Sequence, residues 1–213
     1  AAKEGSHKDI SDLFVRVSRL QYFVMSFILV GFIIFGKEFI IIWGGEDYVQ
    51  TYYVSLIILI PFSFDLISNV GVVILQAENK LKYRSIPLIV GSLIGLVLTF
   101  PFTHYFGVYG CAWAISISIL ISNVLASNIV FYKIAGIDVI QYWKEVMRMS
   151  WFPVLMIVAF MLVKGNLPIH SILSLLCYIL IFSLFYIPLN VMLNMNGWEK
   201  MMIYSLMLKV KNK

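Results

Sequence analysis

Long, nearly uninterrupted apolar runs dominate this chain of 213 residues. Each run covers roughly 15 to 25 residues, which is about what a helix needs to cross a hydrocarbon layer of about 30 Å. With 61% apolar and only 13% charged residues, the composition is far more apolar than that of a soluble domain. A transmembrane barrel is excluded as well, because its strands alternate polar and apolar residues. The sequence therefore predicts an all-α, polytopic membrane protein.

Six transmembrane helices that form one bundle are predicted, with approximate spans 20–35, 52–75, 86–106, 108–132, 149–163 and 169–193. The first is expected to extend N-terminally from near Ile10, and residues 36–50 to turn back. The fifth is short, so five crossings with a buried or re-entrant fifth segment is the alternative. Outside the bundle we expect a cytoplasmic N-terminal segment (1–19), an amphipathic helix on the membrane surface (137–148) and a basic tail (194–213).

Lys and Arg residues are distributed unevenly over the predicted loops. Of the 16 in the chain, only Lys37 and Lys164 fall on one side of the six-span topology, and the other fourteen fall on the opposite side. Because short cytoplasmic loops are rich in Lys and Arg, both termini are predicted to be cytoplasmic. The basic residues flank the spans and form no separate patch, so the net charge of +5 does not indicate nucleic-acid binding.

Small residues recur at every fourth position in two consecutive spans. They are Gly91, Gly95, Thr99 and Thr103 in the third, and Gly110, Ala114, Ser118, Ser122 and Ala126 in the fourth. This spacing lets helix backbones approach closely in lipid. We therefore expect the two spans to pack as a tight hairpin around Gly107.

Asp65 is the charged residue that the sequence places inside a predicted span, about halfway along 52–75. An isolated carboxylate in hydrocarbon is costly, so this side chain must face protein or water, or be protonated. Asn69 shares its helix face, Ser68 is adjacent, and Pro61 one turn earlier is expected to kink the helix. Polar stripes on the fourth and sixth spans add Ser116, Asn123, Ser127 and Asn190.

Three helices with polar faces are consistent with a hydrated cavity, which a transporter needs. We therefore regard these side chains as candidates for a substrate cavity, with Asp65 as the candidate for ion coupling. The alternative is that the Ser and Asn side chains only join helices by hydrogen bonds, each contributing about 0.6 kcal/mol.

No pattern typical of catalysis accompanies these residues, such as a nucleophile elbow or a phosphate-binding glycine loop. His104 and His170 lie at the predicted outer edge of the bilayer without a second ligand at metal spacing. Cys111 and Cys177 lie within apolar runs, and we expect free thiols there. The sequence thus favours a transporter over an enzyme and predicts no cofactor and no metal site.

Three motifs occur in an order that resembles a known family. Residues 35–48 contain Phe-Gly-Lys-Glu followed by Ile-Trp-Gly-Gly, residues 55–86 lead through Gln-Ala-Glu-Asn-Lys-Leu-Lys into the next helix, and residues 105–123 begin Tyr-Phe-Gly-Val-Tyr-Gly-Cys-Ala. Over about Ser11 to Tyr142 the chain resembles the C-terminal half of bacterial polysaccharide repeat-unit flippases. These flippases belong to the multidrug, oligosaccharidyl-lipid and polysaccharide exporter superfamily.

The resemblance implies one half of a MATE-like transporter of twelve or fourteen helices, so the partner would be a missing N-terminal six-helix bundle, on the same or a separate chain. Both predicted termini lie on one side, so two such bundles joined in sequence would form a parallel repeat. The implied substrate is an undecaprenyl-diphosphate-linked oligosaccharide, flipped across the bacterial cytoplasmic membrane for O-antigen, capsule or exopolysaccharide synthesis. Many relatives carry an asparagine where this chain has Gly95, so any role of that amide does not transfer.

Such a substrate implies alternating access, with Asp65 coupling transport to a proton or sodium ion. The diphosphate requires cations, and only Arg16 and Arg19 lie at the predicted cytoplasmic mouth. Most of the positive charge is therefore expected from the absent bundle.

Three other functions stay open from the sequence. The first is a multidrug cation exporter of the same superfamily. The second is a membrane-embedded glycan polymerase or acyltransferase, although the long outer loop that such an enzyme needs is not apparent. The third is a half-length protein that is inactive alone or works as a dimer.

Overall fold

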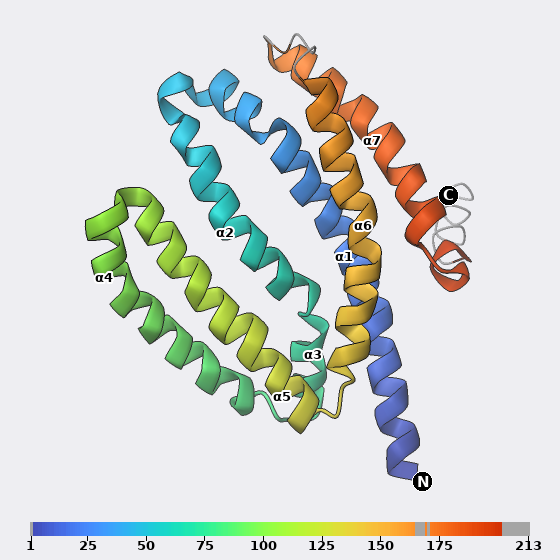
Figure 1. Cartoon of the computed structure of the whole chain (residues 1–213). Coiled ribbons are helices and arrows are strands. Elements are labelled where there is room, and N and C mark those ends of the chain that lie inside the picture. Colours follow the sequence, from blue (N-terminus) through green and yellow to red (C-terminus); the bar gives the residue numbers. More distant parts are fainter. Residues whose placement is uncertain (1, 165–168, 170, 202–213) are drawn as a thin grey trace, which may run out of the picture.

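The computed structural model describes residues 2–164, 169 and 171–201, and this part of the chain is helical with no strand (Figure 1). Five helical stretches are long and apolar enough to cross a membrane, so the chain is a multi-pass helical membrane protein, as predicted. The elements are α1 Ala2–Gly44, η1 Glu46–Tyr48, α2 Val49–Ile67, α3 Val70–Ala77, α4 Lys82–Ile119, η2 Leu120–Ala126, α5 Ser127–Ile134, α6 Val139–Lys164 and α7 Ile172–Asn194.

The third apolar stretch, Lys82–Ile134, is a helical hairpin. It reverses at Gly107, whose φ of 57° and ψ of −135° suit a residue without a Cβ. Its two arms lie side by side in Figure 1. Gly91 faces Ser122 across them, and the Ser118 hydroxyl donates to the Gly91 carbonyl at 2.6 Å. The hairpin predicted from the small-residue spacing is confirmed.

Helix α1 connects two hydrophobic cores. Its 43 residues correspond to about 65 Å, roughly twice the thickness of the hydrocarbon layer. Its N-terminal part packs with α3, α5 and α6 in a core that includes Phe14, Phe131 and Tyr142. Farther along, α1 packs with α6 and α7 in an aromatic core that includes Phe182 and Tyr186.

The predicted turn at residues 36–50 is shorter in the structure. Helix α1 continues through Gly36 to Gly44, and the chain turns at Gly45, whose φ is 100°. The residues after Gly36 are largely apolar and include no proline, so nothing ends the helix there. The turn prediction for residues 36–44 was therefore wrong.

The predicted span 52–75 is interrupted at Ser68 and Asn69, between α2 and α3. The Ser68 hydroxyl donates to the carbonyls of Phe64 and Asp65 at 3.2 and 3.1 Å, and such bonds from a side chain compete with the regular helical pattern. Asp65 consequently lies in the last turn of α2 and not halfway along a span.

Residues 139–148 form the first part of α6 and are not a separate helix. Tyr142, Val146 and Met149 share one face of this continuous helix and are buried in the first core. By contrast, the apolar side chains of Ile140 and Met147 are 75% and 70% exposed. The predicted boundary at residue 148 does not exist, because no glycine or proline interrupts the helix there.

The ends of the described chain are parts of the bundle. Residues 2–19 belong to α1, and α7 agrees closely with the predicted span 169–193. The segment after α7 turns back and reaches α1 through Glu199. The rest of the predicted basic tail, 202–213, lies outside the described residues, as do Ala1 and His170.

Candidate functional site

Asp65 belongs to a polar cluster between α2 and the hairpin. Arg84, near the start of α4, donates to one carboxylate oxygen of Asp65 at 3.1 Å. Asn123 of η2 donates its side-chain amide to the other oxygen at 3.0 Å. In turn, the Ser122 hydroxyl donates to the Asn123 amide oxygen at 2.8 Å. The cluster therefore joins three elements and pairs one anion with one cation.

The position of Asn123 depends on a local change of helix type. Residues Leu120–Ala126 form a π-helix, which shifts the side chains that follow around the helix axis. The Ser127 hydroxyl donates to the carbonyl of Ser122, five residues earlier, at 3.2 Å. Short π-helical segments are frequent at functional sites because they redirect side chains in this way.

Asp65 faces protein, which is one of the alternatives that the sequence left open. Arg84 is only 8% exposed and its guanidinium reaches the Asp65 carboxylate, although the sequence assigned it to a cytoplasmic turn. Asp65 lies at the end of α2 and Arg84 at the start of α4, and the connection through α3 brings the two side chains together. The carboxylate therefore has an ionic partner.

Three of the predicted cavity residues make hydrogen bonds to backbone carbonyls. Ser116 donates to the carbonyl of Ile57 at 2.6 Å and so joins α4 to α2. Ser68 and Ser127 donate to carbonyls one turn earlier in their own segments. These hydroxyls contribute to helix packing in this conformation.

Asn190 lies in the interior of the bundle. Its side chain is 1% exposed, and its amide oxygen accepts from the Asn194 side chain at 2.8 Å. Asn194 also donates to the carbonyl of Met149 at 3.4 Å, which connects α7 to α6. Asn190 therefore belongs to the contact between α6 and α7 and, within the described residues, shares no hydrogen bond with the Asp65 cluster.

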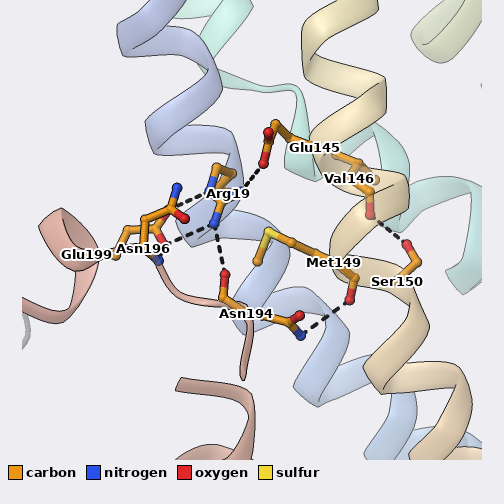
Figure 2. Close-up of polar contacts among 8 residues, drawn as sticks. All are labelled: Arg19, Glu145, Val146, Met149, Ser150, Asn194, Asn196 and Glu199. Atoms are coloured by element: carbon orange, nitrogen blue, oxygen red, sulfur yellow. Dashed lines mark hydrogen bonds and ion pairs between the residues drawn. The ribbon is translucent and has the colours of Figure 1, made fainter. Parts of the chain in front are cut away.

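Arg19 is at the centre of a second polar cluster, which Figure 2 shows. Its guanidinium donates to the two carboxylate oxygens of Glu199 at 2.6 and 3.2 Å, to the Glu145 carboxylate, and to the carbonyl of Asn194 at 2.9 Å. The backbone N–H of Asn196 donates to Glu199 at 2.8 Å. This cluster fastens the segment after α7 to α1 and α6.

The second cluster changes the role expected of Arg19. Two carboxylates already surround its guanidinium, and its side chain is 5% exposed, so it is not available to a diphosphate in this conformation. Arg16 lies over the Trp198 ring at 5.5 Å. Beside them is a pocket of about 300 Å³, whose ionisable lining comprises Asp12, Arg16, Arg19, Glu145 and Glu199.

A groove of about 380 Å³ lies between α1 and α2. Five apolar side chains and two amides line it: Val17, Leu20, Val24, Met25 and Leu66, with Gln21 and Asn69. The residues from α1 recur at helical spacing and so present one face. None of the lining side chains is ionisable. We call this the α1–α2 groove, and Asn69 is the predicted cavity residue that lines it.

Gln21 distinguishes this groove from an ordinary packing gap. Its side-chain amide oxygen is buried and has no hydrogen-bond partner in the described structure. Buried polar atoms are nearly always paired, so an unpaired acceptor beside a groove marks a position that a ligand donor can fill.

The sequence predicted part of this arrangement. It identified Asp65, Asn69 and Asn123 but missed Arg84, Gln21, Glu145 and Glu199. The signal for Arg84 was its position only 19 residues after Asp65. Among the described residues, no group of His, Cys, Asp and Glu is arranged to hold a metal ion.

No family model, no curated protein and no solved structure matches this chain.

Proposed function

We propose that this chain is one helical bundle of a transporter that flips lipid-linked oligosaccharides, of the undecaprenyl-diphosphate type, across the bacterial cytoplasmic membrane. The bundle would cross the membrane six times and work with a second six-helix bundle. The resemblance of the three sequence motifs supports the substrate, and the geometry of the bundle supports the architecture.

The observation that carries the architecture is that the first apolar run begins beside the segment that follows α7. Arg19, which directly precedes that run within α1, pairs with Glu199, which follows α7, at 2.6 Å. An odd number of crossings would place these residues on opposite sides of the membrane. Lys80, which precedes the hairpin, likewise donates to the carbonyl of Ile134 at its end, at 3.0 Å. Counting the hairpin as two crossings makes the total even.

An even number of crossings has a consequence for assembly. A second bundle joined in sequence would keep the same orientation and form a parallel repeat about the membrane normal. Transporters place their substrate between such repeats and expose it to each side in turn. This bundle alone would therefore contribute one wall of the cavity.

Asp65 remains our candidate for ion coupling, with a more specific role. Arg84 and Asn123 hold its carboxylate in the present conformation. A proton or sodium ion would have to compete with Arg84 for this carboxylate. Such competition would release α2 from the hairpin, which is the kind of helix movement that alternating access needs.

The test is deletion of the coding region in the source bacterium, followed by complementation. We expect lipid-linked repeat units to accumulate in the cytoplasmic membrane and surface polysaccharide to decrease, both reversed by the wild-type chain. Asp65→Asn at normal abundance should fail to restore export. Normal surface glycan after deletion would reject the flippase proposal.

A multidrug cation exporter is the second candidate, because one observation favours it. The pocket beside Arg19 is lined by three carboxylates and two guanidinium groups, which suits an organic cation better than a diphosphate. Increased drug susceptibility with unchanged surface glycan in the deletion strain would favour this function.

A further inference from the structure

We infer that the α1–α2 groove binds an uncharged sugar of a glycolipid, with Gln21 and Asn69 contacting its hydroxyl groups. This inference rests on the proposed function and adds where one part of the substrate would bind. The groove would hold the glycan, and the diphosphate would bind elsewhere.

The lack of charged side chains in the groove favours an uncharged ligand. The seven residues that line the groove include no acid and no base. The nearest carboxylate along the chain, Asp65, is occupied by Arg84 and Asn123. A phosphate in this groove would lose its hydration without gaining a cation, which is very unfavourable in apolar surroundings. An uncharged ligand avoids this cost.

The two amides define the polar part of the ligand. The buried oxygen of Gln21 lacks a donor, and an unpaired acceptor of this kind costs about 1–3 kcal/mol. A sugar hydroxyl can donate to this oxygen once the Gln21 amide turns toward the groove. Asn69 lies at the break between α2 and α3 and offers both a donor and an acceptor to a second hydroxyl.

The apolar lining and the size of the groove fit the rest of such a ligand. Val24, Met25 and Leu66 provide surface for the C–H face of a sugar ring or the start of a lipid chain. The groove volume of about 380 Å³ falls within the range of roughly 300 to 1,000 Å³ for small-molecule sites. A single water molecule needs only about 30 Å³.

The experiment uses the full chain in nanodiscs and two photoreactive probes. One is a farnesyl chain that carries a benzophenone and an uncharged disaccharide, and the other is the same farnesyl benzophenone ending in an alcohol. We expect the disaccharide probe to label peptides that contain residues 17–25 or 66–69 at least fivefold more than the alcohol probe. Equal labelling by both probes, or labelling confined to other segments, would overturn the inference.

Substitutions test the role of the amides directly. Gln21→Leu and Asn69→Leu should each weaken labelling by the disaccharide probe about tenfold, because each removes a hydrogen bond to the sugar. Gln76→Leu is the matched control, since Gln76 is an exposed amide on α3 that does not line the groove. Unchanged labelling in both groove variants, with thermal stability equal to that of the control, would contradict the inference.

The two proposals can fail separately. Glycan export that stays normal after deletion would reject the flippase proposal. If the disaccharide probe still binds in a way that depends on Gln21, the proposed sugar site stands. Loss of export after deletion, without sugar-dependent labelling, would support the flippase proposal and reject the sugar site in this groove.

Discussion

Arg84 and Asp65 form an ion pair that joins α4 to α2, with 3.1 Å between the guanidinium nitrogen and the carboxylate oxygen. Their side chains are 9% and 16% exposed, so water screens this pair only weakly. Asn123 occupies the second carboxylate oxygen and adds the π-helical segment to the same contact. Three elements thus depend on one carboxylate, which makes their relative position sensitive to its charge.

We expect Asp65→Asn to lower the free energy of unfolding by about 3 kcal/mol, because it leaves the Arg84 guanidinium buried without its counter-ion. The double variant Asp65→Asn with Arg84→Gln should lose less than the sum of the single losses, with a coupling energy of about 1–3 kcal/mol. Unfolding by SDS titration in mixed micelles measures both quantities. Asp47→Asn, an exposed carboxylate in η1, is the control and should change stability by less than about 0.5 kcal/mol. Strict additivity would contradict an ionic link between α2 and α4.

The Arg19 cluster leads to an asymmetric prediction. Arg19→Leu leaves Glu145 and Glu199 in place with no cation between them, and we expect a loss of about 3–5 kcal/mol. Glu199→Gln keeps the pair of Arg19 with Glu145, so the loss should be about 1 kcal/mol.

Besides the free energy of unfolding, the reactivity of a nearby cysteine can report on this cluster. A cysteine introduced at Asn196 should react faster with maleimide in the Glu199→Gln background, because the segment after α7 is then held less firmly to α1. Equal reaction rates in the two backgrounds would show that Glu199 does not hold this segment. The native cysteines Cys111 and Cys177 are free and would first be replaced by alanine.

The contacts that could be predicted from the sequence are those set by periodicity. Gly91 and Ser122 each belong to a series of small residues at every fourth position, and the turn at Gly107 brings the two series together. Contacts of ionic groups could not be predicted in the same way. Arg19 meets Glu145 and Glu199 across 126 and 180 residues, and only the packing of α1 against α6 and α7 brings them close.

Helix ends showed a related limit of sequence reasoning. Hydropathy indicates where a helix can enter lipid, but it does not indicate where the hydrogen-bonded helix ends. Helix α1 therefore continues past Gly36, and α6 begins at Val139, ten residues before the predicted span. The break at Ser68 is the opposite case, because the helix is interrupted within an apolar segment whose hydropathy changes little.

The hairpin predicts a difference between two glycines. A methyl group at Gly91 would overlap the Ser122 side chain, so Gly91→Ala should destabilise the protein by about 1–3 kcal/mol. Gly31→Ala is the matched control, since nothing lies within 4 Å of the added carbon and alanine favours a helix by up to about 1 kcal/mol. Ser122→Gly should partly rescue Gly91→Ala by restoring the space. Thermal unfolding of Gly91→Ala, Gly31→Ala, Ser122→Gly and the double variant in one detergent tests this, and equal effects at Gly91 and Gly31 would reject the close approach of the arms.

The proposed even number of crossings can be tested by the side of the membrane on which each turn lies. In a cysteine-free background, Lys82→Cys and Lys133→Cys flank the hairpin, while Asp47→Cys and His104→Cys lie at the opposite turns, and all four positions are exposed. Six crossings with the basic turns inside predict that a membrane-impermeant maleimide labels positions 47 and 104 on intact cells, but labels 82 and 133 only after permeabilisation.

Labelling at positions 82 and 133, which flank the hairpin, distinguishes two crossings by Lys82–Ile134 from one. If Lys82–Ile134 crossed the membrane only once, positions 82 and 133 would lie on opposite sides, and one of them would be labelled on intact cells. The ion pair of Arg19 with Glu199 would then have to break, because its partners could not lie on the same side of the bilayer. Labelling of either position from outside would therefore reject the orientation, and labelling of only one of them would also reject the parallel-repeat assembly.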